Sequence, residues 1–214
     1  MTDFAANANC YAKSIRDGSY NETSATTNPE PVRKFFREVG IQGKDILDVG
    51  CGTSLCPGSS VVELAEHKTD RWNSYIGIDL CQEAVDEFNR QYRNRNARAE
   101  TGNAVALEKF SDNSKDIVAS LFVLQELNQE HGMKALRELR RVAKPNAYAL
   151  IGVTVNSKEI EEVKMWRGRE VFIWNRDELM TFLSNEGFNI EEVVEIPGKH
   201  LNYPRQYIKA RVMK

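Results

Sequence analysis

Residues 45–54 read Asp-Ile-Leu-Asp-Val-Gly-Cys-Gly-Thr-Ser, and this segment is the most informative part of the chain about its architecture. Its apolar part, 46–49, predicts a buried strand that leads directly into a turn containing Gly50 and Gly52. Glycine has no β-carbon, so the backbone of such a turn bends sharply and approaches a ligand closely. In an open parallel sheet the turn lies beyond the carboxyl end of the strand, where ligands bind. The stretch therefore predicts a ligand site at the first strand of a parallel sheet.

A second apolar run, 75–78, ends at Asp79, which is 31 positions after Asp48. An acidic residue at the tip of a second strand is well placed to accept hydrogen bonds from both hydroxyls of a ribose. The turn does not continue into the dinucleotide pattern G-x-G-x-x-G, because Leu55 occupies its sixth position, and the lysine of a phosphate-binding P-loop is missing. Together these features predict a ligand that contains adenosine but no phosphate groups.

The rest of the chain alternates short apolar runs with stretches of helical periodicity. Apolar runs at 46–49, 75–78, 117–122 and 147–155 predict strands, and a helix is expected to start within 27–30 and to stop at Gly40. A helix over 177–185 precedes runs at 190–196 and 207–212, whose short separation favours an antiparallel closing pair. The pattern predicts an α/β domain over residues 28–214, after a polar N-terminal arm at 1–27. We expect a mostly parallel, seven-stranded sheet with its last strand antiparallel and helices on both faces.

Composition and charge argue against several classes of protein. The 214 residues are 41% hydrophobic and carry a formal net charge of −2, which suits one domain and argues against a nucleic-acid partner. Residues 1–20 lack the segments of a secretory signal, and no apolar stretch is long enough to span a membrane. The four cysteines have no metal-binding spacing. We therefore expect a cytoplasmic protein with free thiols and with neither a metal nor a membrane partner.

Over roughly residues 30–196 the sequence resembles the class I methyltransferases that use S-adenosylmethionine (SAM). It looks most like the small-molecule branch, whose domain begins with an LDVGCGTG-type motif. The resemblance implies a Rossmann-like fold and SAM as the cofactor. Residues 45–53 match the motif that contacts the methionyl part of SAM, which implies this role for Asp48, Gly50, Cys51 and Gly52. Residues 77–80 match the second motif, in which Asp79 holds the ribose and Leu80 packs against the adenine.

Two later segments extend the resemblance. Residues 102–104 stand where the family has Gly-Asp-Ala, which implies that Asn103 and Ala104 contact the adenine edge. Residues 116–127 match the fourth strand and the loop beneath the reacting sulfonium, which places Leu121 and Phe122 there. Ser54 replaces a third glycine, and Asn103 replaces an acid whose role an amide oxygen can fill. The spacing between the two motifs exceeds the roughly 20 residues expected, so we place an insertion at 55–60 and 68–73.

The implied reaction is an in-line attack of a nucleophile on the sulfonium methyl group, for which the protein aligns the reactants and excludes water. A base is needed only when the nucleophile arrives protonated. The candidates are Glu126, after the fourth strand, and His200, before the last one, while Gln125 is expected to face the substrate. Tyr11 and Tyr20 lie on the arm, which this family often folds over the cofactor as a lid. The alternatives are that Glu126 caps or solvates the start of the next helix, that His200 is structural, and that the arm packs on the core or is a tail.

These residues predict transfer of a methyl group from SAM to an O or N atom of a small molecule or a modified peptide. One alternative is a regulatory protein that binds SAM without turnover. Another is a nucleic-acid methyltransferase. Against it, residues 120–123 read Ser-Leu-Phe-Val instead of Asn/Asp-Pro-Pro-aromatic, and residues 56–57 read Cys-Pro, the reverse of a Pro-Cys nucleophile.

Overall fold

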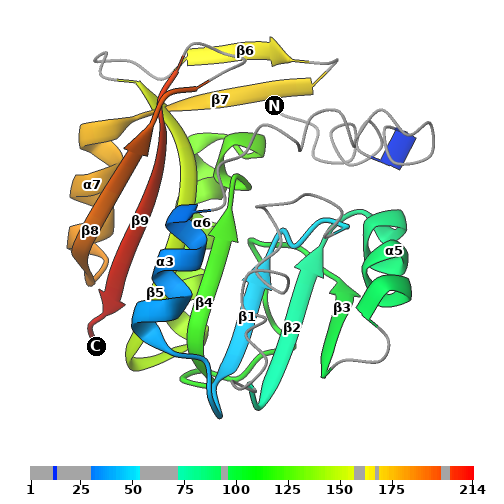
Figure 1. The fold of residues 1–214 in the computed structure, drawn as a ribbon. Coiled ribbons are helices and arrows are strands. Elements are labelled where there is room, and N and C mark those ends of the chain that lie inside the picture. Colours follow the sequence, from blue (N-terminus) through cyan, green and yellow to red (C-terminus); the bar gives the residue numbers. More distant parts are fainter. Residues whose placement is uncertain are drawn as a thin grey trace.

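The computed structural model describes residues 12–13, 30–53, 72–92, 96–156, 162–166, 169–198 and 203–214. Within these ranges the chain forms nine strands in one sheet, with helices on both faces (Figure 1). Five parallel strands follow one another across the sheet in the order β3-β2-β1-β4-β5. Their bounds are Asp45–Val49 (β1), Ser74–Asp79 (β2), Ala97–Thr101 (β3), Lys115–Leu121 (β4) and Ala143–Asn156 (β5). Because these strands are parallel, the carboxyl ends of β1, β2 and β4 meet at one edge of the sheet.

The closing strands are β8 (Phe188–Ile196) and β9 (Arg205–Val212). β9 lies between β5 and β8 and runs antiparallel to both of them. The strands β3-β2-β1-β4-β5-β9-β8 therefore confirm the predicted mostly parallel sheet with an antiparallel last strand.

Two further strands lie beyond the seven of the predicted sheet. β6 (Glu162–Trp166) and β7 (Arg169–Asn175) form an antiparallel hairpin. β7 pairs with the carboxyl end of β5, where Val155 is opposite Trp174 and Asn156 is opposite Asn175. Figure 1 shows the hairpin beyond the upper ends of the parallel strands. It therefore lies at the edge of the sheet where the predicted site is located.

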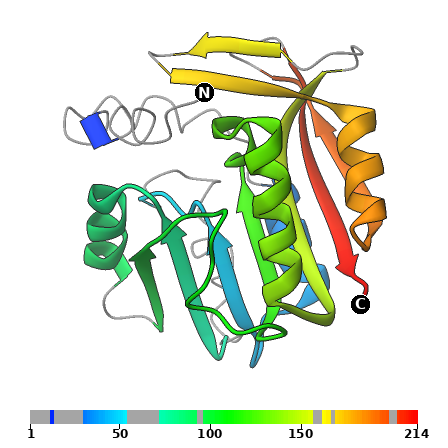
Figure 2. The same cartoon turned by 180° about the vertical axis from the view of Figure 1, so that it is seen from behind.

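The helices cover the sheet from two sides. On one face, α3 (Glu30–Val39) and α5 (Gln82–Tyr92) bury apolar side chains in a common cluster. On the other face, α6 (Gln129–Val142) and α7 (Arg176–Asn185) bury apolar side chains in a second cluster (Figure 2). The side chains of Asn128 and Asn175 cap the amino ends of α6 and α7 by accepting hydrogen bonds from backbone N–H groups.

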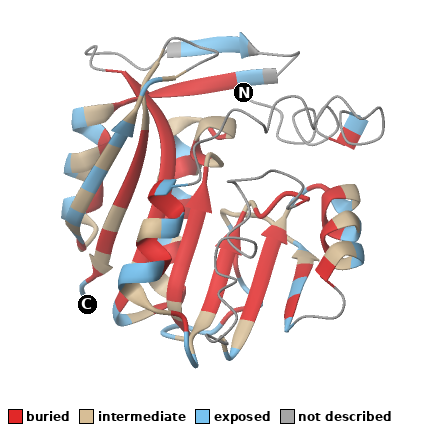
Figure 3. Cartoon of the chain, viewed as in Figure 1, coloured by how far each residue is buried: buried red, intermediate tan, exposed pale blue. Residues whose placement is uncertain are grey.

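The middle strands are buried and rich in branched apolar residues, as expected for parallel strands covered on both faces. Ile46 and Leu47 in β1 and Ile117 in β4 are fully buried. Figure 3 shows this buried core in the centre of the sheet, whereas β8 at one edge alternates between exposed and partly buried residues. A rigid central sheet thus positions the loops at its carboxyl edge.

Candidate active site

The glycine turn that follows β1 is fixed to the end of β2. Gly50 and Gly52 have positive φ angles of 77° and 59°, which glycine adopts without strain. The backbone N–H groups of Gly50 and Cys51 both donate to the carbonyl oxygen of Ile78, at 2.6 and 3.1 Å. A β-carbon at residue 50 would lie 1.8 Å from Cγ2 of Val123, so only glycine fits there. The turn is therefore closely packed against the loop that follows β4.

Asp79 lies at the tip of β2 and is held by two backbone donors. Its Oδ2 accepts from the N–H of Gly52 and its Oδ1 from the N–H of Cys81, both at 2.9 Å. Burial raises the pKa of the Asp79 carboxyl, and these two N–H groups and that of Leu80 oppose the rise. Each carboxylate oxygen keeps a further lone pair for a hydroxyl donor. The structure thus brings the two predicted motifs together through a direct hydrogen bond.

Asp48 lies in β1 beneath the turn and is 2% exposed. The hydroxyl of Tyr75, in β2, donates a hydrogen bond to Oδ2 of Asp48. Burial raises the pKa of Asp48 to about 7, the negative charge of Asp79 adds to the rise, and the Tyr75 hydrogen bond opposes it. A nearby cation would favour the charged form of this buried carboxyl.

Leu80 follows Asp79 in the chain, and a backbone hydrogen bond brings the segment that contains Asn103 close to Asp79. Leu80 is 43% exposed, although it is a large apolar residue. The N–H of Gly102 donates to the carbonyl oxygen of Asp79 at 2.9 Å, which brings the 102–104 segment to the tip of β2. Oδ1 of Asn103 accepts from the N–H of Val105 at 3.1 Å and keeps one lone pair, while Ala104 packs against the core. The structure therefore brings together the residues assigned to ribose and adenine.

The end of β4 has an unusual backbone conformation. Leu121 is buried, and Phe122 has a φ angle of 62°, which is uncommon for a bulky residue. The N–H of Phe122 donates to the carbonyl oxygen of Gly152 at 2.7 Å, and its ring meets the ring of Tyr207 edge-to-face at 5.4 Å. Backbone strain of this kind concentrates at functional sites.

The segment after Phe122 forms a short 3-10 helix, η1 (Leu124–Glu126). Oε1 of Gln125 accepts a hydrogen bond from the hydroxyl of Thr154 in β5 at 2.6 Å, which fixes the amide near the end of β4. Glu126 is the last residue of η1 and is partly buried. The N-cap of α6 is Asn128, whose side chain accepts from the N–H of His131 at 2.9 Å, and not Glu126.

Three predicted site residues, Tyr11, Tyr20 and His200, lie outside the described residues, as do Ser54 and most of the predicted insertion. One described residue of the arm, Ala12, is 4% exposed and packs with Cys81 and Ala84. Cys81 is two residues after Asp79, so Ala12 packs close to the tip of β2. In the described part of the chain, no group of three or more His, Cys, Asp or Glu residues is placed to hold a metal ion. No described helix is long and apolar enough to cross a membrane.

Sequence reasoning missed several residues that contact predicted site residues, namely Tyr75, Val123 and Thr154, and also Arg205, whose guanidinium carbon lies 5.3 Å from the centre of the Phe122 ring. Each of them contacts a predicted residue from another strand or loop. Only the register between strands reveals such contacts, and no local motif signals them.

Comparisons with known proteins identify methyltransferases as similar to this chain. Residues 47–151 match a family described as "Methyltransferase domain". The tRNA (carboxymethyluridine(34)-5-O)-methyltransferase ALKBH8 of Mus musculus is 26% identical over 183 residues, which cover 82% of this chain and 26% of that protein. The chain thus spans about a quarter of the length of this curated relative.

Two solved structures share the fold. The 1,6-didemethyltoxoflavin-N1-methyltransferase of Burkholderia thailandensis, solved with S-adenosylhomocysteine (SAH), has a TM-score of 0.76 at 15% identity, over 98% of this chain and 88% of that one. A SAM-dependent methyltransferase of Methanosarcina mazei has a TM-score of 0.68 at 21% identity, over 84% of this chain and 97% of that one. Residues 47–151 therefore match a methyltransferase domain, and the chain has the fold of class I, SAM-dependent methyltransferases. The predicted family and its methyl donor, SAM, are confirmed.

Proposed function

We propose that this protein transfers the methyl group of SAM to an O or N atom of a small molecule or of a modified peptide. The observation that carries the proposal is the placement of Asp79. Its carboxylate is oriented by the N–H groups of Gly52 and Cys81 at the point where the ends of β1 and β2 meet. A partly buried carboxylate that two backbone N–H groups hold beside a glycine turn suits the two hydroxyls of a ribose.

The surrounding residues fit the other parts of SAM. We assign the adenine to exposed Leu80 and to Asn103 and Ala104, which the Gly102–Asp79 hydrogen bond brings to the same place. We assign the methionyl part to the turn formed by Gly50, Cys51 and Gly52. The buried carboxyl of Asp48 lies beneath this turn, and the positive charge of SAM would favour its ionised form.

SAM supplies an already activated methyl group, so the protein mainly has to align the acceptor and exclude water. We assign Leu121 and Phe122 to the floor of the reaction site, and Gln125, which Thr154 holds in place, to the acceptor. Glu126 and His200 are the candidate bases for an acceptor that arrives protonated.

The N-terminal arm supplies the cover in this proposal, with Tyr11 or Tyr20 touching the cofactor or the acceptor. The packing of Ala12 against Cys81 and Ala84 supports it, because this contact lies beside the tip of β2. A segment that closes over bound reactants keeps water away from the methyl group.

Calorimetry and a transfer assay test the proposal. The protein should bind SAM in the micromolar range, about −8 kcal/mol, and bind NAD and ATP far more weakly. Tighter binding of NAD or ATP would show that the glycine turn has been misassigned. Transfer of a labelled methyl group from SAM into a pool of metabolites then identifies the acceptor. Binding of SAM without transfer to any acceptor would favour the non-catalytic alternative.

A tRNA acceptor is the second candidate, and the likeness to the mouse tRNA methyltransferase favours it. The formal net charge of −2 weighs against it, because contacts to phosphates need a basic surface. Parallel assays with total tRNA and with small metabolites distinguish the two candidates. Because the described cysteines, Cys51 and Cys81, are free thiols, we place the reaction in the reducing cytoplasm.

A further inference from the structure

The long basic residues on one face of β9 have different partners. Lys209 forms ion pairs with Glu38 at 2.9 Å and with Glu191 at 3.7 Å, and Arg211 pairs with Glu191 at 2.9 Å. Arg205 is the first residue of the same strand. Among the residues that the structure describes, no carboxylate forms an ion pair with it. Of these three cations, the one without an ion pair to a described carboxylate thus lies at one end of the strand.

The surroundings of Arg205 are largely apolar. Its side chain is half-buried, and its guanidinium carbon lies 5.3 Å from the centre of the Phe122 ring. Burial lowers the pKa of Arg205, but a guanidinium stays charged in proteins. A half-buried charge without a counter-ion is costly, and the stacking on Phe122 offsets only part of that cost. An anionic ligand would supply the missing partner.

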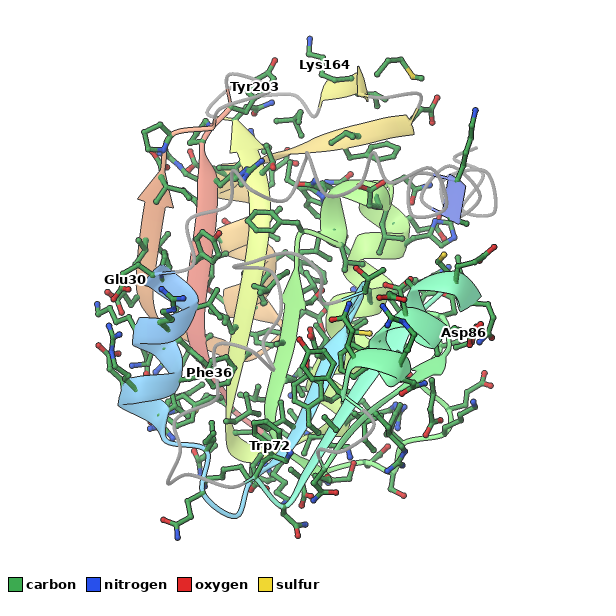
Figure 4. All side chains as sticks on the ribbon, turned by 45° about the vertical axis from the view of Figure 1, so that its right-hand side comes forward. Glu30, Phe36, Trp72, Asp86, Lys164 and Tyr203 are labelled. Atoms are coloured by element: carbon green, nitrogen blue, oxygen red, sulfur yellow. The ribbon has the colours of Figure 1, made fainter. Side chains whose placement is uncertain are left out.

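Arg205 lies beside the proposed acceptor site. In the sheet it is opposite Thr154 of β5, whose hydroxyl holds Gln125. Phe122, beneath its guanidinium, is the strained residue at the carboxyl end of β4. The start of β9 also lies at the edge where the β6–β7 hairpin is attached, and Figure 4 labels Lys164 and Tyr203 at this edge. The unpaired cation is thus on the acceptor side of the sheet, at β4 and β5, and away from the ribose site at β1 and β2.

We propose that Arg205 binds a carboxylate group of the methyl acceptor, so that the enzyme acts on acceptors that carry a carboxylate. The proposal rests on the proposed function, because it assumes that the acceptor lies at the ends of β4 and β5. A guanidinium matches a carboxylate with two parallel hydrogen bonds. Its single positive charge balances a carboxylate, whereas a phosphate monoester carries about −1.5 to −2 charges at neutral pH. The rings of Phe122 and Tyr207 provide an apolar wall for the rest of the molecule.

Phenylacetate and its neutral analogue phenylacetamide are suitable probes, because they differ only in the charged group. Their binding to the full chain is measured by NMR titration, with and without SAH. The variants are Arg205→Met, which keeps an unbranched side chain over Phe122, and Arg205→Lys, which keeps the charge but loses the planar fork. Arg211→Met is the matched control, since Arg211 lies on the same strand face and over an aromatic ring but is paired with Glu191.

We expect phenylacetate to bind the wild-type protein more tightly than phenylacetamide. Arg205→Met should weaken phenylacetate binding by about ten- to a hundredfold and leave phenylacetamide unchanged. Arg205→Lys should lie in between, and Arg211→Met should have no effect. The proposal is overturned if phenylacetate does not bind the wild type, if Arg205→Met leaves its affinity unchanged, or if phenyl phosphate binds more tightly than phenylacetate. SAH affinity is measured separately, so failure to bind SAH would contradict the proposed function without deciding the role of Arg205.

Discussion

A β-carbon on residue 50 would lie 1.8 Å from Cγ2 of Val123, which immediately precedes η1, so the turn after β1 and the loop after β4 occupy adjoining space. We expect Gly50→Ala to lower the free energy of unfolding by about 1–3 kcal/mol more than Gly43→Ala, through overpacking. Gly43 is the matched control because its φ of +68° is similar and nothing lies within 4 Å of an added β-carbon. Urea unfolding of both variants measures the difference, and equal losses would show that Val123 yields to the added methyl group.

The ribose assignment predicts a loss of SAM affinity on changing Asp79. Asp79→Ala should weaken SAM binding by about 1–3 kcal/mol, because two hydroxyls lose a charged acceptor. Calorimetry measures the change in the dissociation constant. Asp86→Ala is the control, since Asp86 is exposed on the neighbouring helix α5 (Figure 4). A dissociation constant unchanged by Asp79→Ala would mean that another residue holds the ribose.

The buried Asp48–Tyr75 pair predicts that stability without ligand depends on pH. The pKa of Asp48 rises from 3.8 to about 7 in the folded state, so between these values the folded state binds a proton that the unfolded state has released. The free energy of unfolding should therefore decrease as the pH rises from 4 to 7. Asp48→Asn removes the carboxyl that causes this pH dependence. We expect the variant to be more stable than the wild type above pH 7 by on the order of 2–4 kcal/mol.

Thermal unfolding of the wild type and of Asp48→Asn across this pH range tests the prediction. The difference in Tm should be small near pH 4 and should grow toward pH 7. Asp86→Asn, which changes an exposed carboxylate, serves as the reference for general charge effects. A Tm difference that stays constant with pH would show that Asp48 does not titrate in this range.

The arm makes a fourth prediction. Deleting residues 1–24 should leave the domain folded but remove most of the methyl transfer or of the SAM affinity, because the cover over the reactants is lost. Ala12→Glu is a smaller change that should act in the same direction, since Ala12 packs against Cys81 and Ala84. Its control is Lys13→Glu, because Lys13 is the exposed neighbour. Full activity of the truncated protein would make the arm a tail.

The sequence predicted the strands whose apolar runs are long enough to be distinctive. The run at 46–49 lies in β1 and the run at 75–78 in β2, and both end at the predicted site. It did not predict β3, whose residues read Ala-Arg-Ala-Glu-Thr, because an edge strand with only alanines to bury has a weak pattern. The hairpin was missed for a related reason, since Val163 and Met165 in β6 are exposed and bury no regular face.

In the candidate site, too, some features could be predicted from the sequence and others could not. Gly50, Gly52 and Asp79 follow their strands directly, so their proximity could be predicted from the rule that parallel strands end at one edge. The Asp48–Tyr75 and Gln125–Thr154 contacts depend on the register of neighbouring strands, which no local pattern specifies. Where Arg205 lies relative to Phe122 depends in addition on β9 being inserted beside β5.

The position of β9 affects the order in which the domain can assemble during synthesis. β9 is the last strand of the sheet in the chain, yet it lies between β5 and β8. Through Lys209 it also contacts Glu38, 171 positions earlier. Residues 148–154 of β5 therefore lack their partner strand on this edge until residues 205–211 have been translated. An unpaired edge of this kind invites association with other chains. We expect the nascent chain to depend on chaperones until its closing strand emerges from the ribosome.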